Sequence, residues 1–344
     1  MRFIKFVLII CLLVTVSACS FNNRKVNNSF YYWQSTFDMN TQEIKKLNKL
    51  NITNLYIKFF DVVWDNQINS PKPVSSIFFK DQIPNKVTVI PTIYITNQTL
   101  RKLSQDQVSL LAENIYKKIN NILNKNNLNK PPEIQLDCDW TETTKTKYFK
   151  LLQFIDEKLE ANTRLSATIR LHQVKYIERT GVPPVDRGAL MFYNLNHPGK
   201  LDVKNSVLDL EVGKQYLNKL SSYPLELDIA LPIYSWGVLF QEDNYMGLIK
   251  NLTEEQLSNN SAFSKVKENT YLAEQNSYVQ GTYVYKNDRI RVDESEYTEL
   301  LNTAKYISKR LSTHKTNIML FHLDENLLRR FEDEQLQKVF STFN

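Results

Sequence analysis

The sequence has few of the residues and motifs that would define its class at once. Of 344 residues only 3 are cysteine and 7 are glycine. Its net charge of +6 comes without a dense run of Lys or Arg, so it does not indicate a nucleic-acid partner. It has no G-x-G-x-x-G turn, phosphate loop, G-x-S-x-G elbow or paired-histidine spacing. We therefore expect no bound cofactor and no metal.

The N-terminus has the features of an export signal. Arg2 and Lys5 precede an apolar run over residues 6–16, and small residues follow at Ser17 and Ala18. The run is shorter than the roughly 20 residues that a transmembrane helix needs. An ordinary cleaved signal is one interpretation of this segment.

The cysteine that follows favours a more specific interpretation. Val16-Ser17-Ala18-Cys19 resembles the bacterial lipobox, whose cysteine is acylated and becomes the new N-terminus. The resemblance implies a signal peptide over residues 1–18, a lipid on Cys19 and membrane attachment through it. We predict a bacterial cell-envelope location, at the outer membrane in a Gram-negative cell.

The remaining chain divides into a short tether and one domain. Residues 19–29 are polar and rich in asparagine, which predicts the tether, and residues 30–344 form the domain. Of the cysteines only Cys138 belongs to this domain, so no disulfide can form inside it and its stability must come from its core.

Strand-like and helix-like patterns alternate through the domain. Helical spacing of apolar residues covers 41–50, 105–123, 145–159, 207–220 and 296–311. Segments rich in β-branched and aromatic residues predict strands at 30–34, 54–60, 87–95, 133–139, 165–172, 189–194, 226–234 and 317–323. Eight strands mostly separated by helices predict an α/β fold, a (β/α)₈ TIM barrel. A doubly wound sheet is the competing architecture, but it usually has a glycine-rich first turn, which is absent.

One stretch interrupts this alternation. Residues 240–293 are polar at first and then include strand-like segments at 278–285 and 289–292, separated by Lys286-Asn287-Asp288. We interpret this stretch as an insertion after the seventh strand that contains a β-hairpin. In a barrel it would lie at the catalytic end.

The segment 133–142, EIQLDCDWTE, carries the strongest chemical signal. Strand alternation places Gln135, Asp137 and Asp139 on one face, and this face would point into the barrel. Buried carboxylates are unfavourable unless they are paired or functional, so two in succession at the carboxyl end of a strand indicate a site. The alternative is that they are structural and pair with Arg170 or with loop amides.

Here the sequence resembles glycoside hydrolase family 18, the chitinase-like barrels. Leu136-Asp137-Cys138-Asp139-Trp140 is similar to the later part of that family's D-x-x-D-x-D-x-E motif. Similar matches follow in order along the chain: Met191-Phe192-Tyr193-Asn194 to M-x-Y-D, Ala230-Leu231-Pro232-Ile233-Tyr234 to G-x-P-x-Y, and Ile318-Met319-Leu320-Phe321 to the last strand, which usually ends in a tryptophan under the sugar.

The resemblance implies a glycan ligand and a substrate-assisted mechanism. In this family a glutamic acid protonates the glycosidic oxygen while the N-acetyl group of the sugar attacks the anomeric carbon. Asp139 would orient that group, and Tyr193 would bind its oxygen.

This sequence departs from the family where the acid should stand. Position 141 is Thr141, and the glutamate comes one residue later, at Glu142. By alternation Glu142 would point away from Asp139, and it could instead stabilise the start of the helix near Lys145. The sixth-strand aspartate is replaced by Asn194.

Several further residues are candidates for the site. Arg170 shares the polar face of its strand and could pair with Asp137 or Asp139. Tyr234, Trp236 and Trp33 lie near strand ends and could stack on a sugar, because the C–H faces of sugars are apolar. Our candidates are therefore Asp139, Asp137, Glu142 and Tyr193 for catalysis, and Asn194, Tyr234, Trp236, Trp33 and Arg170 for substrate binding.

Three functions fit these residues. The first is a membrane-anchored barrel that hydrolyses or binds a glycan, which could contain N-acetylated sugars. The second is a glycan-binding or scaffold lipoprotein that has lost the acid. The third is another hydrolase chemistry built on Asp137, Asp139 and Arg170. The position of the Glu142 carboxylate should discriminate among them.

Overall fold

The computed structural model describes residues 24–344. The expected signal peptide and the expected acylation site at Cys19 lie outside the described residues. In the described part of the chain, no helix has the length and apolarity needed to cross a membrane.

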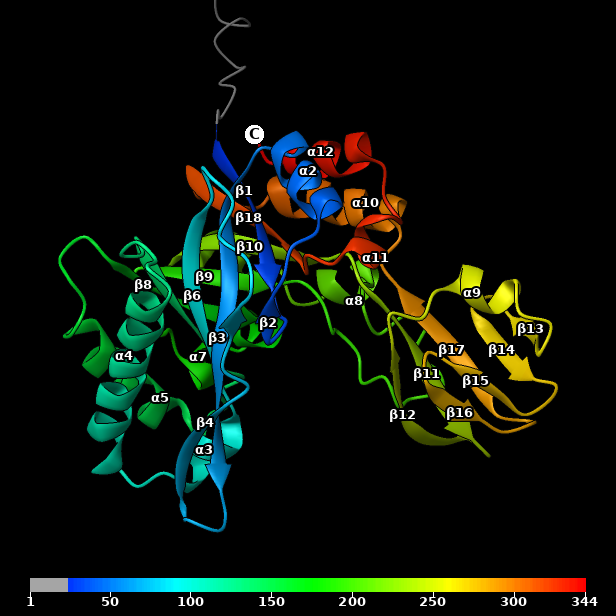
Figure 1. Cartoon of the computed structure of the whole chain (residues 1–344), viewed down its shortest axis with the longest axis horizontal. Coiled ribbons are helices and arrows are strands. Elements are labelled where there is room, and N and C mark those ends of the chain that lie inside the picture. The colour runs from blue at the N-terminus through cyan, green and yellow to red at the C-terminus, as the bar shows by residue number, and fades with distance from the viewer. Residues whose placement is uncertain (1–23) are drawn as a thin grey trace, which may run out of the picture.

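Eight parallel strands close into a barrel (Figure 1). The closure is made by β1, which pairs with β18 on one side and with β3 on the other. The barrel strands are β1 Lys25–Tyr32, β3 Ile52–Asp65, β6 Thr88–Ile95, β7 Glu133–Asp137, β8 Arg164–Arg170, β9 Arg187–Met191, β10 Glu226–Pro232 and β18 Lys315–Phe321. The predicted TIM barrel is confirmed.

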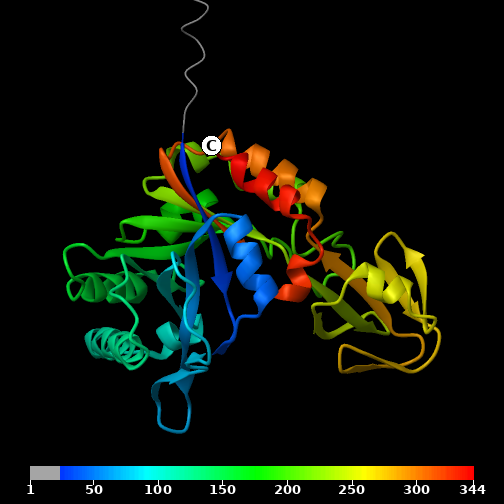
Figure 2. The same ribbon diagram turned by 45° about the horizontal axis from the view of Figure 1, so that its top comes forward.

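Helices surround this barrel (Figure 2). Their bounds are α2 Thr41–Lys49, α3 Asn97–Lys102, α4 Gln107–Lys125, α5 Lys145–Asp156, α6 Leu171–Lys175, α7 Ile177–Thr180, α8 Leu210–Lys214, the 3₁₀ turn η1 Leu220–Ser222, α10 Tyr297–Ser308, α11 Glu325–Leu328 and α12 Asp333–Ser341. The local sequence explains several of the helix ends: α2, for example, starts at a capping box in which Asn40 and Glu43 bond each other's backbone amides.

Two expectations about the chain were wrong. The tether was expected to reach residue 29, but β1 already begins at Lys25, and Arg24 before it is buried. The helix expected over 207–220 is reduced to the short α8. Asp209 has an extended backbone and caps α8, while Val207 and Leu208 are buried in the preceding loop. Their apolar spacing therefore reflects loop packing rather than a helix face.

Strand β3 extends beyond the barrel and pairs antiparallel with β4, Ser70–Val74. Pro71 and Pro73 lie in β4, and since proline has no N–H to donate, they limit pairing at this edge. Two short strands, β2 Thr36–Phe37 and β5 Phe78–Phe79, form a separate parallel pair. The sequence patterns did not predict these additions.

The insertion after the seventh barrel strand is a small sheet domain with its own apolar core. Its elements are β11 Ser235–Gln241, β12 Asn244–Lys250, α9 Glu254–Ser258, β13 Phe263–Lys267, β14 Thr270–Ala273, β15 Ser277–Val279, β16 Thr282–Val284 and β17 Arg289–Glu294. The insertion starts earlier than residue 240.

The hairpin expected within the insertion pairs differently. Segments 278–285 and 289–292 do not pair with each other: β15 and β16 form a hairpin around Gln280 and Gly281, while β17 pairs with β11 and β14. Both turn residues have positive φ, which suits Gly281. The turn signal at 286–288 is a connection within the sheet domain.

Candidate functional site

The polar column predicted on β7 points into the barrel. Glu133, Gln135 and Asp137 are buried in the interior. Tyr31 donates to Gln135 Oε1 at 2.6 Å, and Thr168 donates to Asp137 Oδ1 at 2.7 Å. The apolar residues of the strand face outward, where Tyr148 of α5 bonds the Leu136 carbonyl. Strand alternation therefore located this column correctly.

The lower part of the column belongs to a paired polar layer near the amino ends of the strands. Arg187 donates to both oxygens of Asp228, and the Asn317 side-chain amide donates to Asp228 Oδ2 at 2.9 Å and to the Tyr56 hydroxyl at 3.0 Å. Tyr56 and Ser166 both donate to Glu133 Oε1. These bonds link six strands, β3, β7, β8, β9, β10 and β18, through the interior. We call Tyr56, Glu133, Arg187, Asp228 and Asn317 the lower polar layer.

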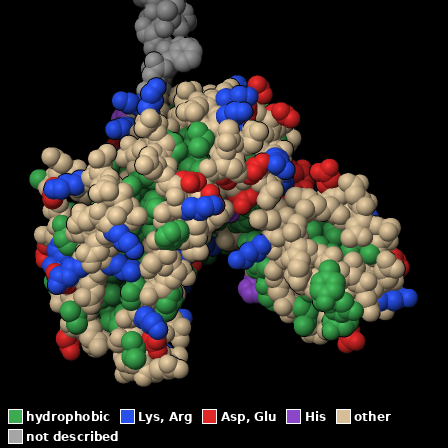
Figure 3. All heavy atoms as spheres, viewed as in Figure 1, with side chains coloured by type: hydrophobic (Ala, Val, Ile, Leu, Met, Phe, Trp, Pro, Cys, Tyr) green, Lys and Arg blue, Asp and Glu red, His purple; other side chains and the backbone are tan. Residues whose placement is uncertain are grey.

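A cavity of about 390 Å³ opens at the other end of the barrel, where the strands have their carboxyl ends. Figure 3 shows this face hollowed between the barrel and the insertion. The cavity is lined by Trp33, Tyr94, Asp137, Asp139, Arg170, Met191, Tyr193, Asn194, Tyr234, Ser235, Trp236, Lys250, Asn251, Phe321 and His322. In a TIM barrel this is the end that carries function.

Aromatic rings form much of this cavity. Phe321 at the end of β18 lies 5.5 Å from Trp33 and 5.3 Å from Tyr193, measured between ring centres. Tyr234 lies 5.7 Å from Phe321 and 5.3 Å from Trp236. Residues far apart in the sequence thus form one aromatic floor, defined here as Trp33, Tyr193, Tyr234, Trp236 and Phe321.

Asp137 is the buried carboxyl group of the cavity. Burial, reinforced by the negative charge of Asp139, raises the pKa of Asp137 to about 7. Thr168 binds only its Oδ1, and among the described residues Oδ2 has no hydrogen-bond donor. One acidic oxygen is therefore free for a ligand or a proton.

Asp139 and Arg170 lie near the opening. Asp139 is about half exposed, and its Oδ1 lies 3.7 Å from Arg170 Nη1. Arg170 also donates from Nη2 to the Asn194 carbonyl at 2.9 Å. Asn194 has a positive φ of 54° and accepts a hydrogen bond from the Tyr234 hydroxyl on its side-chain oxygen. Arg170 thus holds the loop after β9 in place and faces the Asp139 carboxylate.

Other polar atoms at the cavity are buried without a partner within residues 24–344. They are Ser235 Oγ and His322 Nδ1. Burial lowers the pKa of His322, which favours its neutral form. Buried polar groups are normally paired, so unpaired ones beside a cavity indicate a site that a ligand or water completes.

Glu142 does not belong to this site. Its carboxylate pairs with Arg179 on α7, where Arg179 Nε donates to Glu142 Oε2 at 3.0 Å, and it does not line the cavity. Thr141, at the position of the family's acid, shares hydroxyl contacts with Thr143 and Thr144 at the start of α5. After Asp139 the chain turns away from the barrel mouth, because Trp140 is buried and stacked on Tyr148. Glu142 therefore does not face the cavity.

The structure brings together every other candidate. Asp137, Asp139, Tyr193, Asn194, Tyr234, Trp236, Trp33 and Arg170 all line the cavity. Tyr94, Lys250 and Asn251 also line the cavity and were not among the residues predicted from the sequence. Tyr94 ends a predicted strand and could have been found by alternation. Lys250 and Asn251 reach the cavity because β12 returns antiparallel beside β11, which places Lys250 opposite Trp236.

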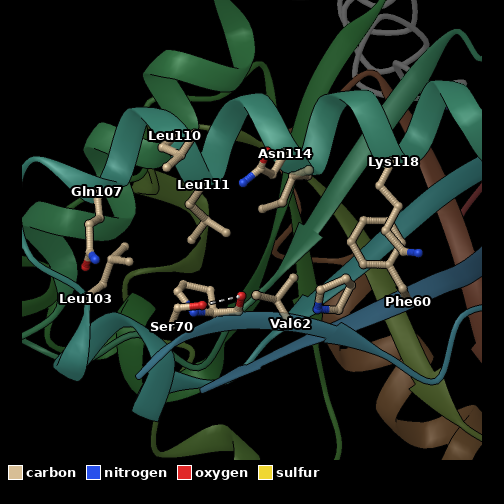
Figure 4. A pocket seen from close by; sticks show the side chains of 12 residues that line it. Phe60, Val62, Ser70, Leu103, Gln107, Leu110, Leu111, Asn114 and Lys118 are labelled. Carbon is tan, nitrogen blue, oxygen red and sulfur yellow. Dashed lines mark hydrogen bonds between the residues drawn. The ribbon is translucent and has the colours of Figure 1, made fainter. Parts of the chain in front are cut away.

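A second cavity lies between α4 and the β3–β4 hairpin (Figure 4). Its volume is about 300 Å³, and apolar side chains such as Phe60, Leu103 and Leu111 dominate its lining. Lys118 is its one charged lining residue, and it has no carboxylate. Within residues 24–344 no group of three His, Cys, Asp or Glu side chains is arranged to hold a metal ion. The apolar lining of this second cavity makes it a weaker candidate for chemistry than the barrel mouth.

Solved structures share this architecture. A chitinase from Chromobacterium violaceum has a TM-score of 0.57 at 12% identity, over 92% of this chain and 99% of that chain. A Group IV chitinase from Ostrinia furnacalis has a TM-score of 0.54 at 10% identity, over 93% and 100%. The spore cortex-lytic enzyme SleL from Bacillus cereus has a TM-score of 0.52 at 13% identity, over 93% and 75%.

No family model and no curated protein sequence matches the chain. At these low identities the structural likeness defines the fold. The chain is a divergent TIM barrel with the chitinase-like fold.

Proposed function

We propose that the barrel mouth binds a glycan. The observation that carries this proposal is the aromatic floor beside the free oxygen of Asp137 in a solvent-open cavity. Aromatic faces can stack on the apolar C–H faces of a sugar ring, while carboxylate and arginine groups bond its hydroxyls. A cavity of about 390 Å³ lies within the size range of small-ligand sites.

A sugar with an N-acetyl group suits this cavity. The Tyr193 hydroxyl has no hydrogen-bond partner among residues 24–344, and Tyr193 lines the cavity together with Asp137. It could donate to an acetamido oxygen, while a carboxylate accepts from the acetamido N–H. The chitinase fold of the solved neighbours supports this choice.

The site best supports a protein that binds a glycan without hydrolysing it by the family mechanism. The acid position holds Thr141, and Glu142 is paired with Arg179 away from the cavity. General acid catalysis needs the acid within hydrogen-bond reach of the glycosidic oxygen. Neither residue meets this requirement.

Hydrolysis with a different acid is the second candidate, favoured by Asp137. A carboxyl group with a pKa of about 7 is partly protonated at neutral pH and can donate a proton. Such activity would decline as the pH rises through about 7, since Asp137 then loses its proton.

We also propose that the chain is anchored to a bacterial envelope membrane by a lipid on Cys19. The lipobox-like tetrapeptide supports this proposal. Because β1 begins at Lys25, the link from Cys19 would span at most about 20 Å when fully extended. In a bacterial host, the N-terminal peptide should carry an acyl mass, and Cys19→Ser should move the protein out of the membrane fraction.

Glycan arrays and calorimetry with the full chain test the ligand. We expect binding of a glycan with N-acetylated sugars, and an affinity about tenfold lower in Trp236→Ala, since a stacking aromatic contributes roughly 1.4 kcal/mol. Tyr278→Ala is the matched control, because Tyr278 is an exposed aromatic of the insertion outside the cavity. Absence of binding to any glycan would reject the proposal.

Turnover is measured on the same glycans, with Asp139→Asn and Asp137→Asn beside the parent protein. Binding without turnover supports the first candidate. Turnover that is lost in Asp137→Asn and falls with rising pH supports the second.

A further inference from the structure

Basic side chains gather beside the start of β1, at the end of the barrel opposite the cavity. Figure 3 shows Lys and Arg side chains around this point. We define the basic patch as Lys25, Lys309, Arg310, His314 and Lys315. Residues 309–314 connect α10 to β18, which begins at Lys315, and Lys25 N donates to the His314 carbonyl at 2.8 Å. The patch is thus one continuous surface.

The cations of this patch lack ion-pair partners. Within residues 24–344 none of them lies within 4.0 Å of a carboxylate, a property they share with other lysines such as Lys200 and Lys267, so their clustering is what sets the patch apart. The guanidinium of Arg310 lies 3.6 Å from the ring centre of Tyr306. Glu226, on the neighbouring strand, pairs instead with Arg187. The positive charge of the patch is therefore not neutralised by acidic partners.

Two of these cations lie directly opposite each other. Lys25 of β1 is in register with Lys315 of β18, and both side chains are exposed. Like charges on facing positions of neighbouring strands destabilise a sheet. The stability of the sheet therefore does not explain why two lysines face each other here. A negatively charged partner would offset their repulsion.

Arg24 fixes the patch to the start of the chain. Its guanidinium donates to the carbonyls of Ser308, Leu311 and Thr313 at 3.2, 2.7 and 2.7 Å. These carbonyls flank Lys309 and Arg310. The start of β1 and the basic connection therefore form one rigid unit rather than a loose arm.

We propose that the basic patch docks on the anionic phospholipid surface of the membrane and turns the cavity away from it. The location rests on the proposed anchor at Cys19, which would hold the start of β1 within about 20 Å of the membrane. Surface charge is screened over a Debye length of roughly 10 Å, and a link of at most about 20 Å lets the patch approach the membrane to within that distance. The strands run from the patch to the cavity, so docking presents the cavity to ligands outside the membrane.

Vesicle flotation tests the docking surface. The full chain is floated with vesicles of phosphatidylcholine alone or mixed with phosphatidylglycerol, and the ratio of anionic to neutral binding is measured. Each cation near such a surface contributes about a fivefold preference. We expect Lys25→Gln with Lys309→Gln and Lys315→Gln to lower the ratio by at least about tenfold, and high salt to lower it in the parent protein.

A charge-matched control separates the patch from net charge. Lys200→Gln with Lys267→Gln and Lys286→Gln removes three exposed cations, one before the seventh strand and two in the insertion. The control should keep the parent ratio. An equal fall in the control, or a parent ratio of one, overturns the proposal. Thermal unfolding confirms that each variant is folded.

Lysine acetylation tests the orientation. Anionic vesicles should protect Lys25 and Lys315 several-fold relative to neutral vesicles, while Lys250 at the cavity stays equally reactive. Protection of Lys250 instead would overturn the orientation. The proposed anchor is tested separately by measuring the acyl mass of the N-terminal peptide. Glycan binding is tested separately by calorimetry.

Discussion

The two ends of the barrel interior differ in how their polar groups are paired. In the lower polar layer, Asp228 accepts from Arg187 and Asn317, and Glu133 accepts from Tyr56 and Ser166. At the cavity, Asp137 keeps a free oxygen, and Ser235 and His322 have buried polar atoms without partners within residues 24–344. Both ends contain buried acids, so the presence of an acid does not distinguish a structural role from a functional one. What distinguishes them is whether the polar atoms of the acid are all bonded to other residues.

Breaking the lower polar layer should change the free energy of unfolding more than any other substitution considered. Asp228→Ala removes the buried carboxylate that Arg187 binds and leaves this buried cation with exposed Glu226 and the Lys315 carbonyl as partners. We expect a loss of about 3–5 kcal/mol in the free energy of unfolding. Urea unfolding measures it. The control is Asp139→Ala, which removes an exposed acid whose ion pair is long and should cost less than about 1 kcal/mol.

Neutralising Asp137, the buried acid of the cavity, should instead increase the free energy of unfolding. The pKa of Asp137 is higher in the folded chain than in the unfolded chain, so the folded state binds more protons between these two values, and stability falls as the pH rises through them to about 7. Asp137→Asn removes this penalty. We expect a gain on the order of 2 kcal/mol at pH 8 and little gain near pH 4.

Urea unfolding at both pH values measures this gain. Asp139→Asn is the control, because Asp139 is about half exposed. A loss of stability in Asp137→Asn at pH 8 would show that Asp137 is structural, like Asp228.

The smallest effect is expected at Glu142. Its ion pair with Arg179 is solvent-exposed, so Glu142→Gln should change the free energy of unfolding by less than about 0.5 kcal/mol. Glycan affinity should stay within about twofold of the parent value, since the residue lies outside the cavity. Calorimetry measures the affinity. A tenfold loss would return Glu142 to the site and sharpen the case for family-type hydrolysis.

Much of the site followed from the sequence because strand periodicity is local. Alternation along β7 placed Gln135 and Asp137 in the interior, and the ends of predicted strands gave Tyr193, Tyr234 and Trp33. The same reasoning failed where the chain leaves a strand. Continued alternation would put Thr141 on the inward face with Asp139, but burial of Trp140 turns this segment toward the start of α5.

The sequence by itself determined the barrel, because the local spacing of apolar residues was enough to predict its eight strands and most of its helices. It also determined the acidic column, because side chains alternate along a strand. Only the tertiary structure decided which acids are paired, since Asp228 meets Arg187 and Asn317 across neighbouring strands. It also decided that Lys250 and Asn251 of the insertion line the cavity. These contacts join residues far apart in the chain, and no local pattern encodes their distance.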